Sequence, residues 1–456
     1  MSSLEKIFQK YNIEVPEGTS FSSIEVSTNL QNAKDNEIIF YKLLSEKSFT
    51  LFKERLIASN PLLIILNKKP IEEIQNNYVV VEESKWKALQ AELLDKIYPI
   101  KNEIKIIGIT GTNGKTSTAF VISEILKQNQ KNVCTVGTNG VFINGRPIDF
   151  DIPNTSPGYV ELRKIIHHAQ EKSDFIVIEV SSHSLSQDRL RDLKLAVAGW
   201  TNISQDHLDY HKNMESYKAA KEKIFDYLVE GSSCFFPAEQ KELYKSIERP
   251  NIEICKKVSL GSNYPSFFKL SHNYQNLSLA VNICNFILGK KVNFDLYKIQ
   301  LPKGRFECLE SNDRLFVIDY AHTPDALENI LSSIKDSFPG KSVWTVFGCG
   351  GDRDKSKRPI MAKVACEHSD FVVVTSDNPR TENSKDIISD IEKGMSGSYT
   401  KIENRSEAIK FAVDESKEKT IVLIAGKGHE TYQEIGTKKY EFDDMKVVKG
   451  FLNVTS

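Results

Sequence analysis

A glycine-rich segment at residues 108–117 has the residue types that hold phosphate groups. Its sequence, Gly-Ile-Thr-Gly-Thr-Asn-Gly-Lys-Thr-Ser, follows a β-branched run and precedes a helical pattern. We interpret it as a phosphate loop of the G-x-x-x-x-G-K-[ST] kind, framed by Gly108 and Gly114. Glycines let backbone N–H groups surround phosphate oxygens, Lys115 can reach the β- and γ-phosphates, and Thr116 can bind Mg²⁺. The segment predicts a nucleotide site but does not identify the reaction.

The elements that must position this loop alternate between strands and helices. Apolar or β-branched runs predict strands, and Thr116 to Gln128 predicts a helix with one apolar face. This alternation favours an α/β fold with doubly wound parallel sheets. Changes in the sequence pattern, and the proline and glycine near residue 302 that interrupt regular structure, divide the chain into three α/β domains, 1–100, 101–302 and 303–456. The predicted strands of the second and third domains are 104–109, 132–135, 175–180, 196–200, 315–318, 342–347, 371–375 and 420–424.

The bulk composition excludes several classes of protein. Sixty basic residues against 61 acidic residues give a formal net charge of -1, which favours neither a nucleic-acid nor a membrane partner. The first 18 residues lack the pattern of a secretion signal, and the apolar patch from Leu62 to Leu66 is too short to span a bilayer. Seven cysteines without a CxxC pair indicate reduced thiols. We therefore expect a cytoplasmic protein.

Several blocks of sequence, in this order, resemble the Mur ligase family and its folylpolyglutamate synthetase relatives. The resemblance runs from about residue 104 to the end and implies a three-domain architecture, with a UDP-binding first domain, a P-loop ATPase domain and a Rossmann-like amino-acid-binding domain. It also implies ATP-dependent amide formation through an acyl phosphate, ATP and Mg²⁺ as cofactors, small-molecule substrates and a monomer. The blocks are 111–117 (Gly-Thr-Asn-Gly-Lys-Thr-Ser), 179–183 (Glu-Val-Ser-Ser-His), 202–211 (Asn-Ile-Ser-Gln-Asp-His-Leu-Asp-Tyr-His), 304–307 (Gly-Arg-Phe-Glu) and 319–325 (Asp-Tyr-Ala-His-Thr-Pro-Asp).

The same resemblance implies the catalytic roles of four residues. Lys115 acts on the phosphates, and Glu179, at the carboxyl end of a predicted strand, is a Mg²⁺ ligand. His207 matches the histidine that holds a second Mg²⁺. Lys221 matches a lysine that the family carbamylates to N6-carboxylysine, which turns a base into an acidic metal ligand. Lysine suits this chemistry because burial lowers its pKa readily and a neutral amine can add CO2.

The remaining site residues follow from the same blocks and their neighbours. Arg189 is a natural partner for the carboxylate of a glutamate. The ATP-binding set is Gly111, Thr112, Asn113, Gly114, Lys115, Thr116, Ser117, Asn273, Asn276, Arg305, Asp319 and His322. The set for the UDP-N-acetylmuramoyl-dipeptide is Thr155, Ser156, Ser181, Gln187 and Arg189.

The choice of amino acid depends on residues 377–380. In family members that add meso-diaminopimelate this block ends in arginine, and in those that add L-lysine the arginine is typically absent. The far carboxylate of diaminopimelate suits a guanidinium fork, whereas the ammonium of lysine meets a like charge. We therefore expect addition of meso-diaminopimelate to UDP-N-acetylmuramoyl-L-alanyl-D-glutamate, in the peptidoglycan synthesis that underlies cell shape and division. The implied amino-acid contacts are Arg353, Asp377, Asn378, Pro379, Arg380, Gly426 and Glu430.

Three alternatives remain at this point. One is another ligase of the superfamily, adding L-lysine, D-alanyl-D-alanine or glutamate to a folate. The others are a P-loop phosphotransferase that forms no amide, and a catalytically inactive sensor of cell-wall precursors. The first domain departs from the family pattern: Ser27-Thr28 and Asn36-Glu37 stand where a Ser-Arg pair and a Gly-Asp turn help to hold the uridine.

Overall fold

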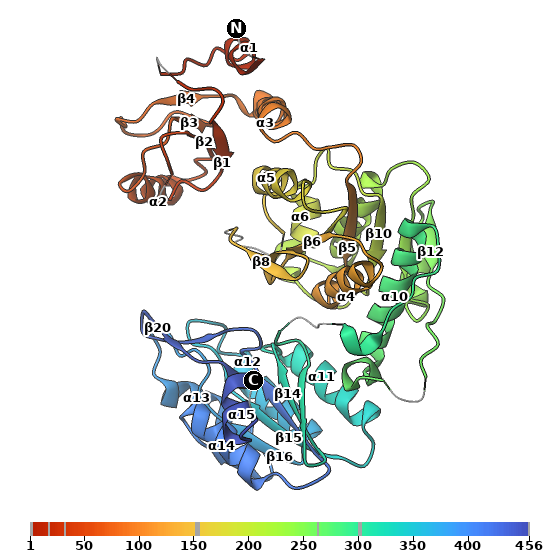
Figure 1. The fold of residues 1–456 in the computed structure, drawn as a ribbon. Helices are drawn as coiled ribbons and strands as arrows, with labels where there is room; N and C mark the ends of the chain where they lie inside the picture. The colour runs from red at the N-terminus through yellow and green to blue at the C-terminus, as the bar shows by residue number, and fades with distance from the viewer. Residues whose placement is uncertain are drawn as a thin grey trace.

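The structure is a computed structural model that describes residues 3–16, 19–31, 33–150, 156–261, 264–299 and 303–454. In these ranges the chain forms a four-stranded, an eight-stranded and a six-stranded sheet and a separate two-stranded hairpin. Figure 1 shows each of the three sheets with its own helices, in three successive parts of the chain. The α/β class expected from the sequence is confirmed.

The N-terminal unit is a small parallel sheet in the order β1-β2-β3-β4. Strands β2 and β3 are short, mainly apolar runs, and their alternate side chains belong to hydrophobic clusters on opposite faces. A sheet covered on both faces explains why these runs are continuously apolar. The elements are α1 Ser3–Lys10, β1 Glu25–Ser27, β2 Glu37–Tyr41, α2 Glu46–Leu56, β3 Leu63–Leu66, β4 Tyr78–Val80 and α3 Glu83–Ile97.

The central unit is built on the eight-stranded sheet, ordered β12-β11-β10-β5-β9-β6-β7-β8. Its first six strands are parallel, and β7 and β8 add an antiparallel edge. The strands are β5 Lys105–Thr110, β6 Val133–Gly137, β7 Gly140–Ile143, β8 Arg146–Ile148, β9 Phe175–Glu179, β10 Val197–Trp200, β11 Cys234–Phe236 and β12 Ile252–Ile254.

Helices cover both faces of this central sheet. Helices α4 and α10 contact each other and share one hydrophobic cluster with Ile107 and Ile109 of β5. Ile106 of the same strand faces the second cluster, which includes α5. The helices are α4 Lys115–Gln128, α5 Tyr159–Ala169, α6 Ser182–Ser186, α7 Leu208–His211, α8 Met214–Glu222, η1 Lys223–Tyr227, α9 Lys241–Lys245, η2 Ser266–Lys269, α10 Ser271–Leu288 and η3 Leu296–Lys298.

The C-terminal unit carries the six-stranded sheet, ordered β13-β14-β18-β15-β16-β17, with β13 antiparallel at one edge. A hairpin of β19 and β20 follows β18 and lies at the edge of this unit in Figure 1. The elements are β13 Glu307–Ser311, β14 Arg314–Asp319, α11 Pro324–Ser337, β15 Ser342–Phe347, α12 Lys357–His368, β16 Phe371–Val374, α13 Ser384–Glu392, β17 Tyr399–Lys401, α14 Arg405–Glu415, β18 Thr420–Ala425, β19 Tyr432–Ile435, β20 Lys438–Glu441 and α15 Asp444–Phe451.

The predicted site residues gather at the carboxyl ends of parallel strands. In the central unit, the loops after β5, β9 and β10 begin beyond Thr110, Glu179 and Trp200. In the C-terminal unit, the loops after β14, β15, β16 and β18 meet at one sheet edge in the same way. Parallel α/β sheets bind their ligands at this edge. Among the residues described, no helix is both long enough and apolar enough to cross a bilayer.

Candidate functional site

The phosphate loop connects β5 to α4, but Gly108 is not one of its framing glycines. Five residues separate Gly108 from Gly114, one more than the motif allows, and Gly108 lies inside β5. The framing positions are Gly111 and Gly114, with φ of +143° and +82°, values that L side chains rarely adopt. A Cβ on Gly111 would lie 1.9 Å from Thr201 Oγ1. Our assignment of Gly108 was therefore wrong, and Gly111 takes its place.

The loop is fixed by the segment that follows β10. The Thr112 N–H donates to the carbonyl of Asn202 at 3.1 Å, and the Asn113 N–H donates to Asn202 Oδ1 at 3.0 Å. Thr201 Oγ1 donates to the carbonyl of Asn113 at 2.6 Å. Its backbone is thereby ordered by protein contacts before a phosphate arrives, which reduces the entropic cost of binding.

Two lysines converge on one carbonyl of this loop. Lys115 Nζ donates to the Gly111 and Thr112 carbonyls at 3.0 and 2.8 Å, and Lys221 Nζ donates to the same Gly111 carbonyl at 2.8 Å. Desolvation by burial lowers the pKa of both lysines. The pKa of Lys221 lies well below its ordinary value, because burial lowers it and the nearby charge of Lys115 lowers it further. Lys221 is thus poised to be a neutral amine.

Glu179 ends β9 as a buried carboxylate that accepts hydrogen bonds from two other segments. Thr116 Oγ1 donates to its Oε2 at 2.9 Å, and the Thr138 N–H and Oγ1 donate to Oε1 and Oε2 at 3.0 and 3.1 Å. Burial raises the pKa of Glu179, and the neighbouring Lys115 opposes that shift. A carboxylate and a threonine hydroxyl beside a phosphate loop are the hard oxygen ligands that Mg²⁺ prefers, so Glu179 and Thr116 fit this ion.

The second predicted metal position is more open. His207 is exposed, with φ of +52°, and its Nε2 lies 3.4 Å from Asp206 Oδ2. The Tyr217 ring lies near both predicted ligands: its centroid is 6.3 Å from the His207 ring and 4.7 Å from Lys221 Nζ. No group of three or more His, Cys, Asp or Glu side chains is arranged to hold a metal in the described ranges. The acidic side chain beside His207 is that of Asp206.

The two asparagines predicted to lie near ATP are buried one helical turn apart on α10. Asn276 abuts the phosphate loop, since a Cβ on Gly114 would lie 2.7 Å from its Oδ1. Asn273 instead donates from Nδ2 to the carbonyl of Phe267 at 3.1 Å. The structure therefore brings Asn276 to the loop and gives Asn273 a contact within its own segment.

The nucleotide residues predicted in the C-terminal unit form a compact group. Arg305 lies over the Tyr320 ring, 5.0 Å from its centroid, and close enough to Lys115 to lower the pKa of that lysine. Both Asp319 oxygens accept backbone N–H groups, from Phe306 at 2.8 Å and Ala321 at 2.9 Å. His322 is exposed, and its ring lies 4.6 Å from that of Tyr320. Asp319 shapes the turns on either side, and Arg305 is the member that approaches the phosphate loop.

Four of the five residues predicted for the muramoyl-dipeptide form one connected group around α6. Arg189 Nη1 donates to the Ser156 carbonyl at 2.6 Å, and its Nε and Nη2 donate to Gln187 Oε1 at 3.1 and 2.7 Å. Ser156 Oγ donates to Ser181 Oγ at 3.2 Å, and the Ser181 side chain caps α6. The fifth predicted residue, Thr155, lies outside the described residues.

A cavity of about 390 Å³ lies between the N-terminal sheet and α5. Trp86, Gln90 and Lys42 line it from the N-terminal unit, and Tyr159 and Arg191 line it from the central unit. Among the described residues, Gln90 Oε1 and two nitrogens of Arg191 find no hydrogen-bond partner, although both groups are withdrawn from solvent. Buried polar groups are rarely unsatisfied, so this cavity is suited to a polar ligand.

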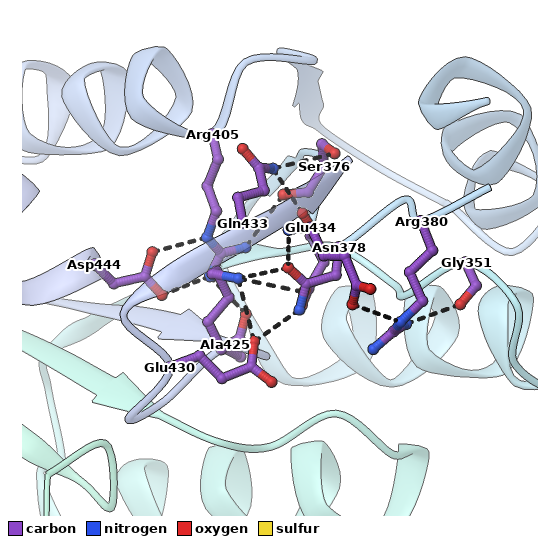
Figure 2. Close-up of polar contacts among 12 residues, drawn as sticks. Gly351, Ser376, Asn378, Arg380, Arg405, Ala425, Glu430, Gln433, Glu434 and Asp444 are labelled. Carbon is purple, nitrogen blue, oxygen red and sulfur yellow. Dashed lines mark hydrogen bonds and ion pairs between the residues drawn. The ribbon is translucent and has the colours of Figure 1, made fainter. Parts of the chain in front are cut away.

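The amino-acid contacts predicted in the C-terminal unit cluster around Asn378 (Figure 2). Asn378 Nδ2 donates to Glu430 Oε2 at 2.7 Å, and its Oδ1 accepts from Lys427 Nζ and the Glu434 N–H, both at 2.9 Å. Lys427 is fully buried and lies 3.2 Å from Glu430 Oε2. The backbone of Gly426 closes against Asp377, because a Cβ there would lie 2.4 Å from its Oδ2.

Arg380 and Arg353 differ in how they are held. The Arg380 guanidinium is partly buried, donating from Nη1 to the Gly351 carbonyl at 2.8 Å and from Nε to Glu434 Oε2 at 3.2 Å (Figure 2). Arg353 is exposed in the loop after β15. Pro379 is buried, and its carbonyl lies 1.9 Å from where a Cβ of Gly351 would be. The structure thus fixes Arg380 and leaves Arg353 in solvent.

A buried ion pair supports the loops from beneath. Arg405 and Asp444 are both fully buried, and Arg405 Nε and Nη2 each lie 2.8 Å from an Asp444 carboxylate oxygen. Arg405 also donates to the Ser376 carbonyl at 3.4 Å and the Ala425 carbonyl at 3.1 Å, as Figure 2 shows. These carbonyls precede the loops that carry Asn378 and Glu430, so one guanidinium joins the two loops.

Our sequence analysis did not identify Lys427, Glu434, Arg405 or Asp444. Lys427 lies between the predicted residues Gly426 and Glu430, so a buried partner for Glu430 could have been sought there. The other three carry no signal, because Arg405 and Asp444 are 39 positions apart and Glu434 is one of many charged residues of its region.

Comparison with known proteins identifies the family. The model of the Mur ligase middle domain matches residues 109–303, and that of the Mur ligase glutamate ligase domain matches residues 304–428. The chain is similar to UDP-N-acetylmuramoyl-L-alanyl-D-glutamate--2,6-diaminopimelate ligases of Caldanaerobacter subterraneus (35% identity, covering 88% of this chain and 89% of that protein) and Rickettsia typhi (34% identity, covering 98% and 95%).

Solved structures agree with these relatives. A structure of a UDP-N-acetylmuramoyl-L-alanyl-D-glutamate--2,6-diaminopimelate ligase covers 98% of both chains with a TM-score of 0.58 and 28% identity. The MurF ligase from Thermotoga maritima in complex with ADP shares the fold, with a TM-score of 0.61, 16% identity and coverage of 95% of this chain and 98% of that one. The chain belongs to the Mur ligase family of ATP-dependent, amide-forming ligases.

Proposed function

We propose that this Mur ligase joins meso-2,6-diaminopimelate to the D-glutamate of UDP-N-acetylmuramoyl-L-alanyl-D-glutamate, in cytoplasmic synthesis of peptidoglycan precursors. The observation that supports the identity of the amino-acid substrate is that two opposite charges lie in the region around Asn378. Arg380 is held on one side for a carboxylate, and Glu430 is held on the other for an ammonium. Diaminopimelate ends in a carbon that bears both groups, whereas lysine ends in an ammonium alone. The relatives named above carry the name of this activity.

The first stage forms an acyl phosphate on the nucleotide substrate. The γ-carboxylate of the D-glutamate attacks the γ-phosphorus of ATP, and ADP leaves. Lys115, which now lies on two loop carbonyls, turns to the phosphates and stabilises the charge that develops on them. Thr116 and Glu179 would hold Mg²⁺, which would stabilise that charge further when bound.

Lys221 contributes as a carbamate rather than as an ammonium. Its buried amine and lowered pKa favour the neutral form that adds CO2. The resulting carbamate would place an acidic group beside the phosphate loop, where the Lys221 amine contacts the Gly111 carbonyl. With His207, which lies near the same Tyr217 ring, it would hold a second Mg²⁺.

The substrates reach this centre from the two other units. We assign the cavity beside Trp86 and Arg191 to the uridine diphosphate, with the dipeptide running past Arg189 and Ser156 toward the phosphate loop. This assignment gives the N-terminal unit a UDP-binding role, the central unit an ATP-binding role and the C-terminal unit an amino-acid-binding role. In the second stage the amine attacks the acyl carbon, the amide forms and inorganic phosphate leaves.

The acyl phosphate must be shielded from water during the reaction. We expect the C-terminal unit to close onto the central unit and to bring Arg305 against the nucleotide. Asp319 moves with Arg305, because it accepts the backbone N–H groups of Phe306 and Ala321 and so fixes the turns around them.

The test is reconstitution with each substrate omitted in turn. Phosphate release should require ATP, the UDP-linked dipeptide and diaminopimelate together, and the product should have the mass of the UDP-linked tripeptide. Phosphate release without an amino acid would instead favour a phosphotransferase. Tripeptide formed with lysine but not with diaminopimelate would keep the ligase and reject the proposed substrate.

A further inference from the structure

The hairpin of β19 and β20 contacts the amino-acid loop through Gln433, Glu434 and Gly436, and Glu434 makes three of these hydrogen bonds. The Glu434 N–H donates to Asn378 Oδ1 at 2.9 Å, and its carbonyl accepts the Arg380 N–H at 3.1 Å. Its carboxylate accepts from Arg380 Nε at 3.2 Å. Glu434 therefore contacts two of the four predicted residues of the 377–380 loop, Asn378 and Arg380, through its backbone and its side chain (Figure 2).

The backbone of Arg380 needs this support. Its φ is +50°, an uncommon conformation for a long side chain. The hairpin closes on it from both directions, because Arg380 N–H donates to the Glu434 carbonyl and Gly436 N–H donates to the Arg380 carbonyl at 2.7 Å. A strained conformation persists only where its surroundings determine it fully, and such residues concentrate at functional sites.

The guanidinium is oriented but not saturated. Arg380 Nε donates to the Glu434 carboxylate, and Nη1 donates to the Gly351 carbonyl. Within the described ranges, Nη2 of Arg380 makes no hydrogen bond. Arg380 and Glu434 retain side-chain exposures of 20% and 27%, so a ligand can reach the remaining edge. A planar fork fixed at two nitrogens presents its other N–H groups in a defined direction.

We propose that Glu434 is a positioning residue that aims Arg380 at the far carboxylate of the incoming amino acid. The inference rests on the proposed function and adds a residue on which selectivity for carboxylate-ended amino acids depends. Glu434 acts through Arg380 and through Asn378, and it does not contact the substrate itself. The opposite arrangement, in which Glu434 competes with the substrate carboxylate for Arg380, predicts an effect of opposite sign.

The experiment compares steady-state kinetics of the full-length enzyme and three variants. Glu434→Ala should raise the KM for diaminopimelate about tenfold with kcat within about twofold, because an oriented contact is lost while the chemistry is intact. Its preference for diaminopimelate over lysine should fall, and its KM for ATP should stay at the wild-type value. Glu434→Gln should retain most of the affinity, because its amide oxygen still accepts from Nε. Glu441→Ala, on β20, removes a side chain that is 79% exposed and pairs with Lys446; it is the matched control and should behave as wild type.

The outcomes separate the inference from the proposed function. A lower KM for diaminopimelate in Glu434→Ala would show competition and overturn the positioning role. Joint losses in kcat, ATP affinity and melting temperature would show a structural role only, and they too would overturn it. An unchanged Glu434→Ala, in an enzyme that uses diaminopimelate, would reject the inference alone. Wild-type enzyme that ignores diaminopimelate would reject both.

Discussion

The phosphate loop and the amino-acid loops are built in opposite ways. The first is a contiguous segment, Gly111 to Ser117, ordered by backbone geometry and by contacts to Thr201 and Asn202. The second assembles side chains from the loops after β15, β16 and β18 and from the hairpin, with Asn378 at the centre. The triphosphate is the same in every ATP, so a backbone loop can bind it. Amino acids differ in their side chains, so a network of protein side chains is needed to distinguish them.

The phosphate loop serves a task common to enzymes that bind ATP, whereas the amino-acid loops determine which amino acid this enzyme accepts. A backbone cradle recognises any triphosphate, and its contacts survive many changes of side chain. A network of side chains is sensitive to each member, because removal of one leaves its partners unsatisfied in a buried place. Changes in the phosphate loop should therefore reduce catalysis with every substrate, and changes in the amino-acid loops should alter stability and selectivity first.

The largest expected effect comes from Lys115→Ala. Loss of the cation at the transferred phosphate should lower kcat by about 10³-fold with any acceptor amino acid, because stabilisation of developing charge is the main catalytic contribution. Phosphate release measures this loss, and circular dichroism with a melting curve serves as the control for folding. Turnover within tenfold of wild type would place the reacting phosphate elsewhere.

Arg405→Met should destabilise the C-terminal unit by about 3–5 kcal/mol, because it leaves Asp444 as an uncompensated buried charge beneath both loops. Urea unfolding followed by Trp344 fluorescence measures this change, in a background where Trp86 and Trp200 are replaced by phenylalanine. These are the three tryptophans of the chain, so Trp344 then reports on its own sheet.

Two further variants sharpen this result. Lys410→Met, on the same helix, removes a solvent-exposed ion pair with Asp414 and should cost less than about 1 kcal/mol. The double variant Arg405→Met/Asp444→Leu should recover much of the loss, because no buried charge then lacks a partner. Equal losses in Arg405→Met and Lys410→Met would contradict the supporting role given to the buried pair.

The smallest effect is one of stability and depends on pH. Lys221→Met should be more stable to unfolding than wild type in CO2-free buffer at neutral pH, since the lowered pKa means that folding disfavours the protonated amine. The unfolded chain holds this proton up to a pKa of about 10.4. The advantage of the variant should therefore shrink as pH rises toward that value. The Gly111 carbonyl keeps Lys115 as a donor in the variant.

Denaturant titrations of both proteins from neutral to alkaline pH test this expectation. A stability difference that is constant or grows with pH would show that Lys221 keeps an ordinary pKa. Addition of bicarbonate should stabilise wild type and leave Lys221→Met unchanged if the amine is carbamylated.

The sequence predicts the fold well where structure is local. Apolar runs become β5, β9, β14 and β18, and Glu179 stands at a strand end as the pattern of its run indicates. The phosphate loop is contiguous, so its position was predictable even though Gly108 was assigned wrongly. The spacing of the motif already excludes Gly108, and the backbone shows that Gly111 and Gly114 have a positive φ.

The amino-acid loops were predictable only in part, for physical reasons. Asn378, Arg380 and Glu430 stand in blocks that the family shares, but their supports come from distant segments. The partner of Arg405 is 39 residues away, and Glu434 meets Arg380 across 54 residues. Long-range pairs of charged residues leave no periodicity in a single sequence, because any of the 121 charged residues could be a partner.

The most direct test of the account is the ratio of kcat/KM for meso-diaminopimelate to that for L-lysine, measured in wild type and in Arg380→Met. We expect a wild-type ratio of at least about 100, because lysine lacks the carboxylate that Arg380 would bind and places an ammonium near the guanidinium, which repels it. We also expect that Arg380→Met lowers this ratio toward unity, mainly through the KM for diaminopimelate. A wild-type ratio near or below unity, or a ratio that Arg380→Met leaves unchanged, would contradict the account.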